Sequence, residues 1–323
     1  MERLGLAIML VVCILLSACG TSSGATSGVA ASTYIQNVGS DTIVNLALAW
    51  AERYQQEHPE VRISVSGGGS GTGLAALISK TVDIANASRQ IKPEEVKEAE
   101  ANGVEPQEYV IARDAIAVIV NPENPVKRLT LEQISKIYRD EINNWKELGG
   151  EDRPIVRLSR ETNSGTHVYF LESVIRLGNK DNKDIFSADT LLLPSSEGII
   201  SEVSDNPNAI GYDGLGYVTS TVKVLALSKD PDGPYVMPSV DTVNDGSYPI
   251  SRDLYMYTGK NPSDAIRAYL EWITGAEAQQ IVSQLGFVPI VHPTGSATLN
   301  ENSPDPLGQG LTFLPGRAAG GRE

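Results

Sequence analysis

Short apolar runs alternate along this chain with segments in which apolar residues recur at helical spacing. Strands are expected at residues 33–38, 61–65, 115–120, 154–159, 208–212 and 222–227. Helices are expected at about 42–57, 129–138, 263–273 and 276–286, with one more from about 166 and another that follows residues 70–72 and has Leu74, Leu77 and Ile78 on one face. The run "AIAVIV" at 115–120 is apolar throughout, as is typical of a strand buried on both faces. No tandem repeat of fixed period occurs. Strands that alternate with helices predict an α/β fold with mostly parallel sheet.

The tripeptide Ser-Gly-Thr occurs twice, at 70–72 and 164–166, each time between a predicted strand and a predicted helix. A third junction, "VGSDT" at 38–42, has the same position, and five of the seven residues from 67 to 73, around the first tripeptide, are glycines. Helix N-termini carry free N–H groups and partial positive charge, and in parallel sheets these junctions lie at one edge. The pattern therefore predicts that a small anion contacts backbone N–H groups of all three junctions. Ordinary helix caps are the alternative for each junction taken alone.

Two enzymatic explanations of the glycine loop are not met. A nucleotide-type phosphate loop needs a lysine after its last glycine, where Leu74 stands. A nucleophile elbow needs G-x-S-x-G, but Thr72 occupies the position two residues after Ser70. The histidines, His58, His167 and His292, are scattered and make no metal constellation, so we expect no metal and no cofactor.

The net charge of the chain limits the kinds of molecule that it can bind. The net charge of −14 argues against nucleic acid, which needs a basic face. The electrostatic field of this negative charge also opposes an anionic ligand, so local dipoles and one or two fixed cations must outweigh it at the binding site. Arg160, four residues before Ser164, could supply a planar fork of donors for a tetrahedral oxyanion, with a surface arginine as the alternative. Tyr212 and Asp213 lie near a strand end, where they either line a cleft or pack.

The N-terminus has the features of a targeting signal. Arg3 precedes an apolar run from Leu4 to Leu16 that is too short to span a bilayer, and "LSAC" closes it at Cys19. We expect residues 1–18 to be a cleaved lipoprotein signal peptide that leaves Cys19 lipidated, with an ordinary secretion signal as the alternative. Residues 19–32 then form a flexible tether and 292–323 a C-terminal tail. The protein is expected outside the cytoplasm, anchored to the cell membrane, without a disulfide.

Five segments together resemble the phosphate-binding proteins of bacterial phosphate ABC transporters (PstS family). They are "VGSDTIVNLALAWAERY", "GGGSGTGLAALISKTVDIANASR", "IYRDEINNWKELGG", "RETNSGT" and "NPNAIGYDGLGY", within residues 33–289. The resemblance implies a two-lobed, periplasmic-binding-protein-like α/β fold of type II with the ligand in the cleft between lobes. Lobe I would take residues 33–114 and 246–291, and lobe II residues 115–245.

The resemblance also carries over a set of phosphate-binding residues. They are Ser40, Asp41 and Thr42 in the first junction, Ser70, Gly71 and Thr72 in the glycine loop, and Arg160, Ser164, Gly165 and Thr166 in the third segment. Many members have an acidic hydrogen-bond acceptor after a "VDFGAS"-like stretch, whereas this chain has Ser88 and Arg89 there. Asp41 is the acid in these junctions that could take that role, with Ser88 as a further candidate contact.

The function implied is a non-enzymatic, lipid-anchored protein that binds inorganic phosphate and delivers it to the permease of an ABC transporter. Lobes that close on the ligand would signal occupancy to the permease. Three alternatives stay open at this point. The ligand could be sulfate, molybdate or tungstate; the chain could be a secreted phosphatase, although no metal pair or activated nucleophile is evident; or it could be a sensor or scaffold without transport.

Overall fold

A computed structural model describes residues 33–290 of the chain. The predicted signal peptide, the predicted lipidation site Cys19, the predicted tether and the predicted C-terminal tail with His292 lie outside these described residues. None of the helices in the described part is both long and apolar enough to cross a membrane.

The described residues form eleven strands. Their bounds are β1 Thr33–Gly39, β2 Val61–Ser66, β3 Ile84–Ala87, β4 Pro106–Val120, β5 Arg128–Thr130, β6 Val156–Arg160, β7 Leu191–Leu193, β8 Ala209–Gly214, β9 Lys223–Val224, β10 Ala226–Ser228 and β11 Ser251–Gly259. The α-helices are α2 Asp41–Glu57, α3 Ser70–Ile78, α4 Pro93–Ala101, α5 Leu131–Tyr138, α6 Gly165–Phe170, α7 Ser196–Asp205, α8 Val240–Asn244, α9 Asp264–Ile273 and α10 Ala276–Gln284. Two 3₁₀ turns, η1 (Trp145–Leu148) and η3 (Leu215–Tyr217), and a π-helical turn, η2 (Leu171–Ile175), complete the set.

One mixed sheet runs through the whole described molecule in the order β2-β1-β3-β11-β4-β8-β6-β7, with β9 paired to β4. Parallel pairings within each half flank the antiparallel pairings made by β4 and β11 in the middle. A separate parallel pair joins β5 and β10. The sheet is therefore less parallel than the strand–helix alternation predicted, because two long antiparallel strands connect its halves.

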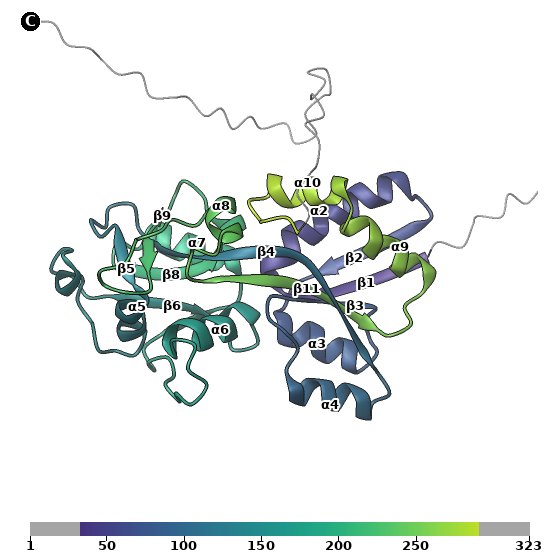
Figure 1. Ribbon diagram of the computed structural model, residues 1–323, viewed down its shortest axis with the longest axis horizontal. Coiled ribbons are helices and arrows are strands. Elements are labelled where there is room, and N and C mark those ends of the chain that lie inside the picture. Colours follow the sequence, from purple (N-terminus) through teal and green to yellow (C-terminus); the bar gives the residue numbers. More distant parts are fainter. Residues whose placement is uncertain (1–32, 291–323) are drawn as a thin grey trace, which may run out of the picture.

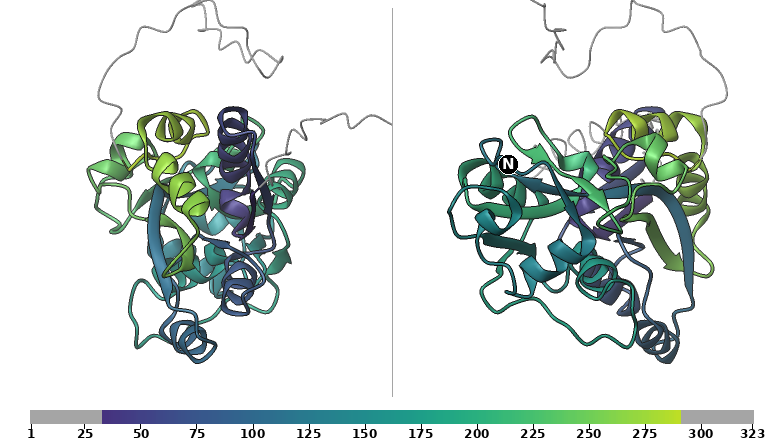
Figure 2. Two further views of the ribbon diagram at one scale, coloured as in Figure 1. Left: turned by 90° about the vertical axis from the view of Figure 1, so that its right-hand side faces the viewer. Right: turned by 60° about the vertical axis from the view of Figure 1, so that its left-hand side comes forward.

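Two lobes lie at the two ends of this sheet (Figure 1). We call lobe I the part built on β1, β2 and β3, and lobe II the part built on β6, β7 and β8. In lobe I, helices α2, α9 and α10 cover one face of the sheet and α3 and α4 the other. In lobe II, α5 and α6 pack on one face and α7 on the other. The two further views show the same separation of helices to both faces (Figure 2).

Each lobe has its own apolar core. Trp50 of α2 is fully buried in lobe I, and its indole N–H donates to the carbonyl of Ala278 in α10 at 2.9 Å, which ties the start of the chain to its late helices. Tyr248 and Ile250 pack with the core of lobe II, whereas Leu254 packs with that of lobe I. The lobe boundaries predicted at residues 114 and 246 stay a prediction.

Two predicted strands differ from those observed. The strand predicted at 115–120 is β4, which begins at Pro106 instead of Ala115 because the less apolar residues 106–114 pair with β11 across lobe I. The segment 222–227 divides into β9 and β10, which pair with β4 and β5 respectively. The other predicted elements are present, and α2 buries the predicted face of Ile43, Leu46, Ala47, Trp50 and Tyr54.

Candidate functional site

Serine hydroxyls from three elements of lobe I meet at the boundary with lobe II. Ser40, the N-cap residue of α2, donates from Oγ to Ser88 Oγ at 2.9 Å. Ser70, the first residue of α3, has its Oγ 3.3 Å from the same atom and accepts the Ser88 backbone N–H at 3.0 Å. All three serines are buried. The first two predicted junctions and Ser88 thus form one hydroxyl cluster.

The second Ser-Gly-Thr approaches this cluster from lobe II. A Cβ atom at Gly165 would lie 2.4 Å from Ser70 Oγ and 2.5 Å from Ser88 Oγ, so only glycine allows this approach. Thr166 Oγ1 lies 2.8 Å from Thr42 Oγ1. Two N-termini of lobe I and that of α6 in lobe II therefore converge, as the sequence predicted for an anion site.

Arg160 is fully buried and is not a surface arginine. Its Nη2 donates to Asp41 Oδ2 at 2.6 Å across the lobe boundary, and its Nη1 donates to Ser196 Oγ at 2.8 Å. Nε and Nη2 also donate to backbone carbonyls before α7. Most of the guanidinium donors are thus engaged with the protein, and contact between Arg160 and an anion stays a prediction.

Asp41 lies in the first turn of α2, which begins one residue earlier than predicted, and Ser40 holds the N-cap position. The Asp41 carboxylate has two partners. Oδ1 accepts the backbone N–H of Gly68 at 3.0 Å, and Oδ2 accepts from Arg160. Asp41 is therefore an ionic link between lobes in this structure, and its role as acceptor for a ligand is untested by these contacts.

The glycine loop makes room for a backbone segment of lobe II. Gly71 donates its N–H to the carbonyl of Asn163 at 2.9 Å, and a Cβ at Gly69 (φ +90°) would lie 2.9 Å from that same oxygen. The Asn163 side chain donates to the carbonyl of Gly68 at 2.9 Å. Thr72 is exposed, and its hydroxyl also bonds Gly68. Gly71 and Thr72 thus lie beside a contact between lobes, and their predicted role in ligand binding is untested.

Arg252 of β11 is a site residue that the sequence interpretation missed. Its Nη2 donates to Thr166 Oγ1 at 3.0 Å and to Thr42 Oγ1 at 3.4 Å, and its Nη1 donates to the carbonyl of Ser88 at 3.0 Å. Asp114 of β4 accepts from Nη2 at 3.0 Å and from Nε at 3.3 Å, both on Oδ2. A buried ion pair therefore joins the two long central strands directly beneath the threonine hydroxyls.

The sequence did not decide whether a second carboxyl beside the site, that of Asp213, lines a cleft or packs. Asp213, at the end of β8, is fully buried with Oδ2 3.7 Å from Arg160 Nη1, and that oxygen has no hydrogen-bond partner among residues 33–290. Burial raises the pKa of Asp213, and the Arg160 charge opposes the shift. Burial raises the pKa of Asp114 to about 6, against the lowering effect of Arg252. Both carboxyls are thus easier to protonate than ordinary aspartates.

Tyr212 and His167 are packing residues. Tyr212 stacks on Phe170 with ring centroids 3.5 Å apart, and its hydroxyl lies 2.6 Å from Ser159 Oγ. His167 stacks on Phe186, and its Nδ1 lies 3.0 Å from the same Ser159 hydroxyl. Burial lowers the pKa of His167, so the ring is neutral near pH 7.

Two signals could have identified the missed ion pair. In "ARDAIAV", Asp114 has the inward position between the buried Ala112 and Ile116. In "PISRDLY", Arg252 alternates in the same way with Ile250 and Leu254. A charge at the inward position of a buried strand needs a partner, so the two residues could have been matched.

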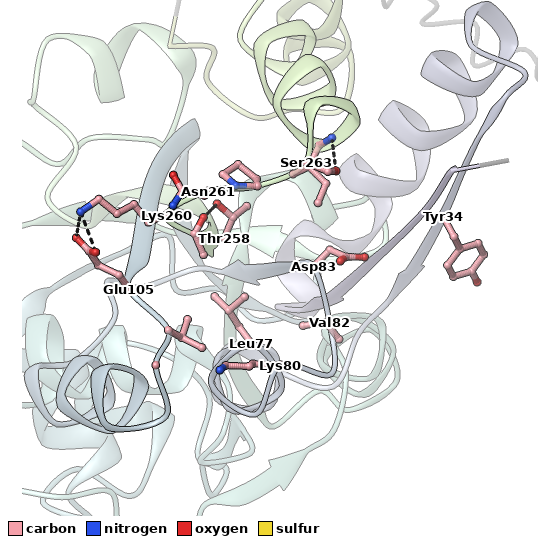
Figure 3. A pocket seen from close by; sticks show the side chains of 15 residues that line it. Tyr34, Leu77, Lys80, Val82, Asp83, Glu105, Thr258, Lys260, Asn261 and Ser263 are labelled. Carbon is pink, nitrogen blue, oxygen red and sulfur yellow. Dashed lines mark hydrogen bonds and ion pairs between the residues drawn. The ribbon is translucent and has the colours of Figure 1, made fainter. Parts of the chain in front are cut away.

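The surface has two large hollows that can be compared with the position of the site. A hollow of about 480 Å³ at the lobe boundary is lined by Arg89, Lys92, Lys180 and Arg252 together with the acids Glu172 and Asp253 and seven other residues. A second, of about 570 Å³, lies on lobe I near the ends of β1 and β11 and contains none of the candidate site residues (Figure 3). Its charged pair, Lys260 and Glu105, is more than half exposed. The first hollow therefore adjoins the site through Arg252.

Comparison with known proteins agrees with this architecture. A family model described as "PBP superfamily domain" matches residues 24–277. The phosphate-binding protein PstS of Pseudomonas aeruginosa is 32% identical over 284 residues, covering 83% of this chain and 86% of that protein. The chain belongs to the PstS family of phosphate-binding proteins. The PstS protein of Bacillus subtilis is also 32% identical, over 78% of this chain and 79% of its own length.

Solved structures of PstS-family relatives have the same fold. A putative phosphate ABC transporter substrate-binding protein from Clostridium perfringens, solved with bound phosphate, matches with a TM-score of 0.72 at 32% identity, over 80% of this chain and all of that one. An ABC-type phosphate transport receptor from Vibrio cholerae matches with a TM-score of 0.63 at 29% identity, over 79% of this chain and 99% of that one. The predicted two-lobed fold and the predicted family are confirmed.

Proposed function

We propose that this protein binds inorganic phosphate outside the cytoplasm and delivers it to the permease of an ABC transporter, without catalysing a reaction. The observation that carries the proposal is the meeting of three helix N-termini and of the hydroxyls of Ser40, Thr42, Ser70, Ser88 and Thr166 at the lobe boundary. Such a set of donors suits a small tetrahedral oxyanion. The relatives' names, which specify phosphate, support this ligand over other oxyanions.

Calorimetric titration tests the ligand. Purified protein freed of phosphate is expected to bind phosphate with far higher affinity than sulfate, molybdate or tungstate. If another of these anions binds more tightly than phosphate, that anion is the ligand and the proposal is wrong. Incubation with a chromogenic phosphate ester, with and without divalent metals, tests for a phosphatase; turnover would contradict a purely binding role.

We propose Asp41 as the residue that separates phosphate from sulfate. Near neutral pH phosphate keeps a proton and can donate to a fixed carboxylate, whereas sulfate presents only lone pairs. Asp41→Asn is expected to narrow the phosphate-to-sulfate affinity ratio by about tenfold or more. Because the asparagine also removes a negative charge beside Arg160, sulfate affinity is expected to rise. An unchanged ratio would leave Asp41 as a link between lobes only.

We propose that Cys19 carries a lipid that holds the protein at the membrane, because it follows a small-residue cleavage site. Cys19→Ala is expected to release the protein from membranes or to leave it unprocessed. The check is membrane fractionation together with electrophoretic mobility, and wild-type behaviour of the variant in both would contradict the anchor.

A further inference from the structure

We propose that Arg252 binds the phosphate directly, as a second guanidinium of the anion site, and ties binding to closure of the lobes. This inference rests on the proposed function. The side chain of Arg252 is 3% exposed, and its Nη2 donates to one hydroxyl from each lobe, Thr42 and Thr166. A donor shared between the lobes in this way ties them together only when they are closed.

The orientation of the guanidinium supports a ligand role. Nε and Nη2 both donate to a single oxygen, Asp114 Oδ2, so the ion pair occupies one edge of the fork. The other edge, formed by Nη1 and Nη2, faces the Ser88 carbonyl and the two threonine hydroxyls. Nη1 carries two N–H groups but has one acceptor within residues 33–290. The guanidinium thus keeps donor capacity on the edge that faces the hydroxyls.

Electrostatics give a second, independent argument. Arg160 is neutralised by Asp41 at 2.6 Å and lies 3.7 Å from Asp213, so it alone leaves no positive charge at the site. A chain with a net charge of −14 needs a further fixed cation where an anion binds. Among residues 33–290, Arg252 pairs with one carboxyl, Asp114, at 3.0 Å, and burial raises the pKa of that carboxyl to about 6.

The hollow at the lobe boundary provides access from solvent. Arg252 lines it together with three other cations, Arg89, Lys92 and Lys180, against the acids Glu172 and Asp253. Arg89 is paired with Glu95, which does not line the hollow. Four cations and two acids thus line this hollow, and among them Arg252 also donates to the hydroxyls of Thr42 and Thr166.

A purely structural role is the alternative: Arg252 would serve only to neutralise Asp114 between β4 and β11. The variant Asp114→Asn separates the two roles. If Arg252 is only the partner of Asp114, removing either member of the pair disturbs the site in the same way. If Arg252 binds the anion, the asparagine removes a competing charge and leaves the guanidinium available to the ligand.

The experiment measures phosphate affinity by calorimetry and lobe closure by small-angle X-ray scattering for wild type and four variants. Arg252→Gln is expected to weaken phosphate binding about a hundredfold, and Arg252→Lys about tenfold, because lysine lacks the planar fork. Asp114→Asn is expected to bind within about threefold of wild type, or more tightly. The control is Arg267→Gln, an exposed arginine on α9 of lobe I, which is expected to change nothing. Arg252→Gln is also expected to lose most of the phosphate-induced decrease in radius of gyration.

Wild-type phosphate affinity in a folded Arg252→Gln protein would overturn the inference, as would equal losses in Arg252→Gln and Asp114→Asn. If the glutamine variant does not fold, Arg252→Lys decides, because it keeps a charge beside Asp114, and full affinity in that variant would overturn the proposal. Wild-type protein that binds no phosphate would contradict the proposed function itself. Normal wild-type binding with unaffected Arg252 variants would contradict only the present inference.

Discussion

Gly165 shows at the level of single atoms how closely the two lobes approach. Its position leaves no space for a Cβ between the hydroxyls of Ser70 and Ser88, which belong to the opposite lobe. The backbone angles there are not the reason for glycine, since Gly165 has no positive φ. Glycine is required because a side chain would hold the lobes apart.

Gly165→Ala is therefore expected to weaken phosphate binding by about a hundredfold while leaving the folding of each lobe intact, because the clash exists only when the lobes meet. Calorimetry gives the affinity and a thermal melt without phosphate gives the stability. Gly259→Ala is the matched control, since a Cβ there meets nothing within 4 Å. A Gly165→Ala protein with wild-type affinity would show that binding does not need this approach.

At the level of elements, two helix N-caps in lobe II allow an effect on folding stability to be distinguished from an effect on phosphate binding. Helix α6 in lobe II has Ser164 as its N-cap residue, whose hydroxyl accepts the N–H of Thr166 at 3.2 Å beside the hydroxyl cluster. Helix α5 in the same lobe begins with Thr130, whose hydroxyl accepts the N–H of Gln133 at 3.1 Å. Both residues satisfy a free N–H group, but only one lies at the lobe boundary.

Ser164→Ala and Thr130→Ala are each expected to lower the free energy of unfolding by about 1 kcal/mol. Only Ser164→Ala is expected to weaken phosphate binding as well, by about tenfold or more. Urea denaturation and calorimetry on the two variants give both quantities. A loss of affinity in both variants, in proportion to stability, would mean that Ser164 acts only as a cap.

At the scale of the whole molecule, the central strands β4 and β11 both join the lobes and carry the buried pair of Asp114 and Arg252. The folded pKa of Asp114, about 6, is above the usual value for an aspartate in an unfolded chain. The folded protein therefore binds this proton more tightly. Stability from this group is fully present below about pH 4 and is lost as the pH rises towards 6.

Asp114→Asn removes that dependence, because an amide does not titrate. The free energy of unfolding of wild type, relative to the asparagine variant, is expected to fall by about 2 kcal/mol between pH 4 and pH 7. Urea denaturation of both proteins at several pH values gives this difference, and the titrations common to both cancel. A difference that does not vary with pH would show that Asp114 has an ordinary pKa.

The sequence predicted many of the elements and the converging helix starts because those features depend on local pattern, but it missed β3, β7, β11, α4 and α7. Alternation identified most strands, and the two Ser-Gly-Thr segments identified Ser70 and Gly165 as neighbours before any contact was known. The partners of charged groups do not follow from local pattern in the same way: inward positions mark Asp114 and Arg252 as needing partners but do not say which residues they meet. Asp41 and Arg160 are 119 positions apart, and Asp114 and Arg252 are 138 apart, so only the folded sheet shows that each pair meets. The acceptor role of Asp41 was inferred without knowledge of its bond to Arg160.

The buried charges at the lobe boundary couple phosphate binding to the uptake of protons. Two arginines, Arg160 and Arg252, face three carboxyls, Asp41, Asp114 and Asp213, so the site is negative when all are ionised. A bound phosphate adds negative charge and raises the pKa of Asp114 above about 6, so binding near pH 7 takes up a proton. Calorimetry in buffers of different ionisation enthalpy is expected to show this uptake in wild type and less in Asp114→Asn, and equal uptake would contradict it. Release of phosphate would then return protons to the surroundings, so a higher pH around the protein would favour release.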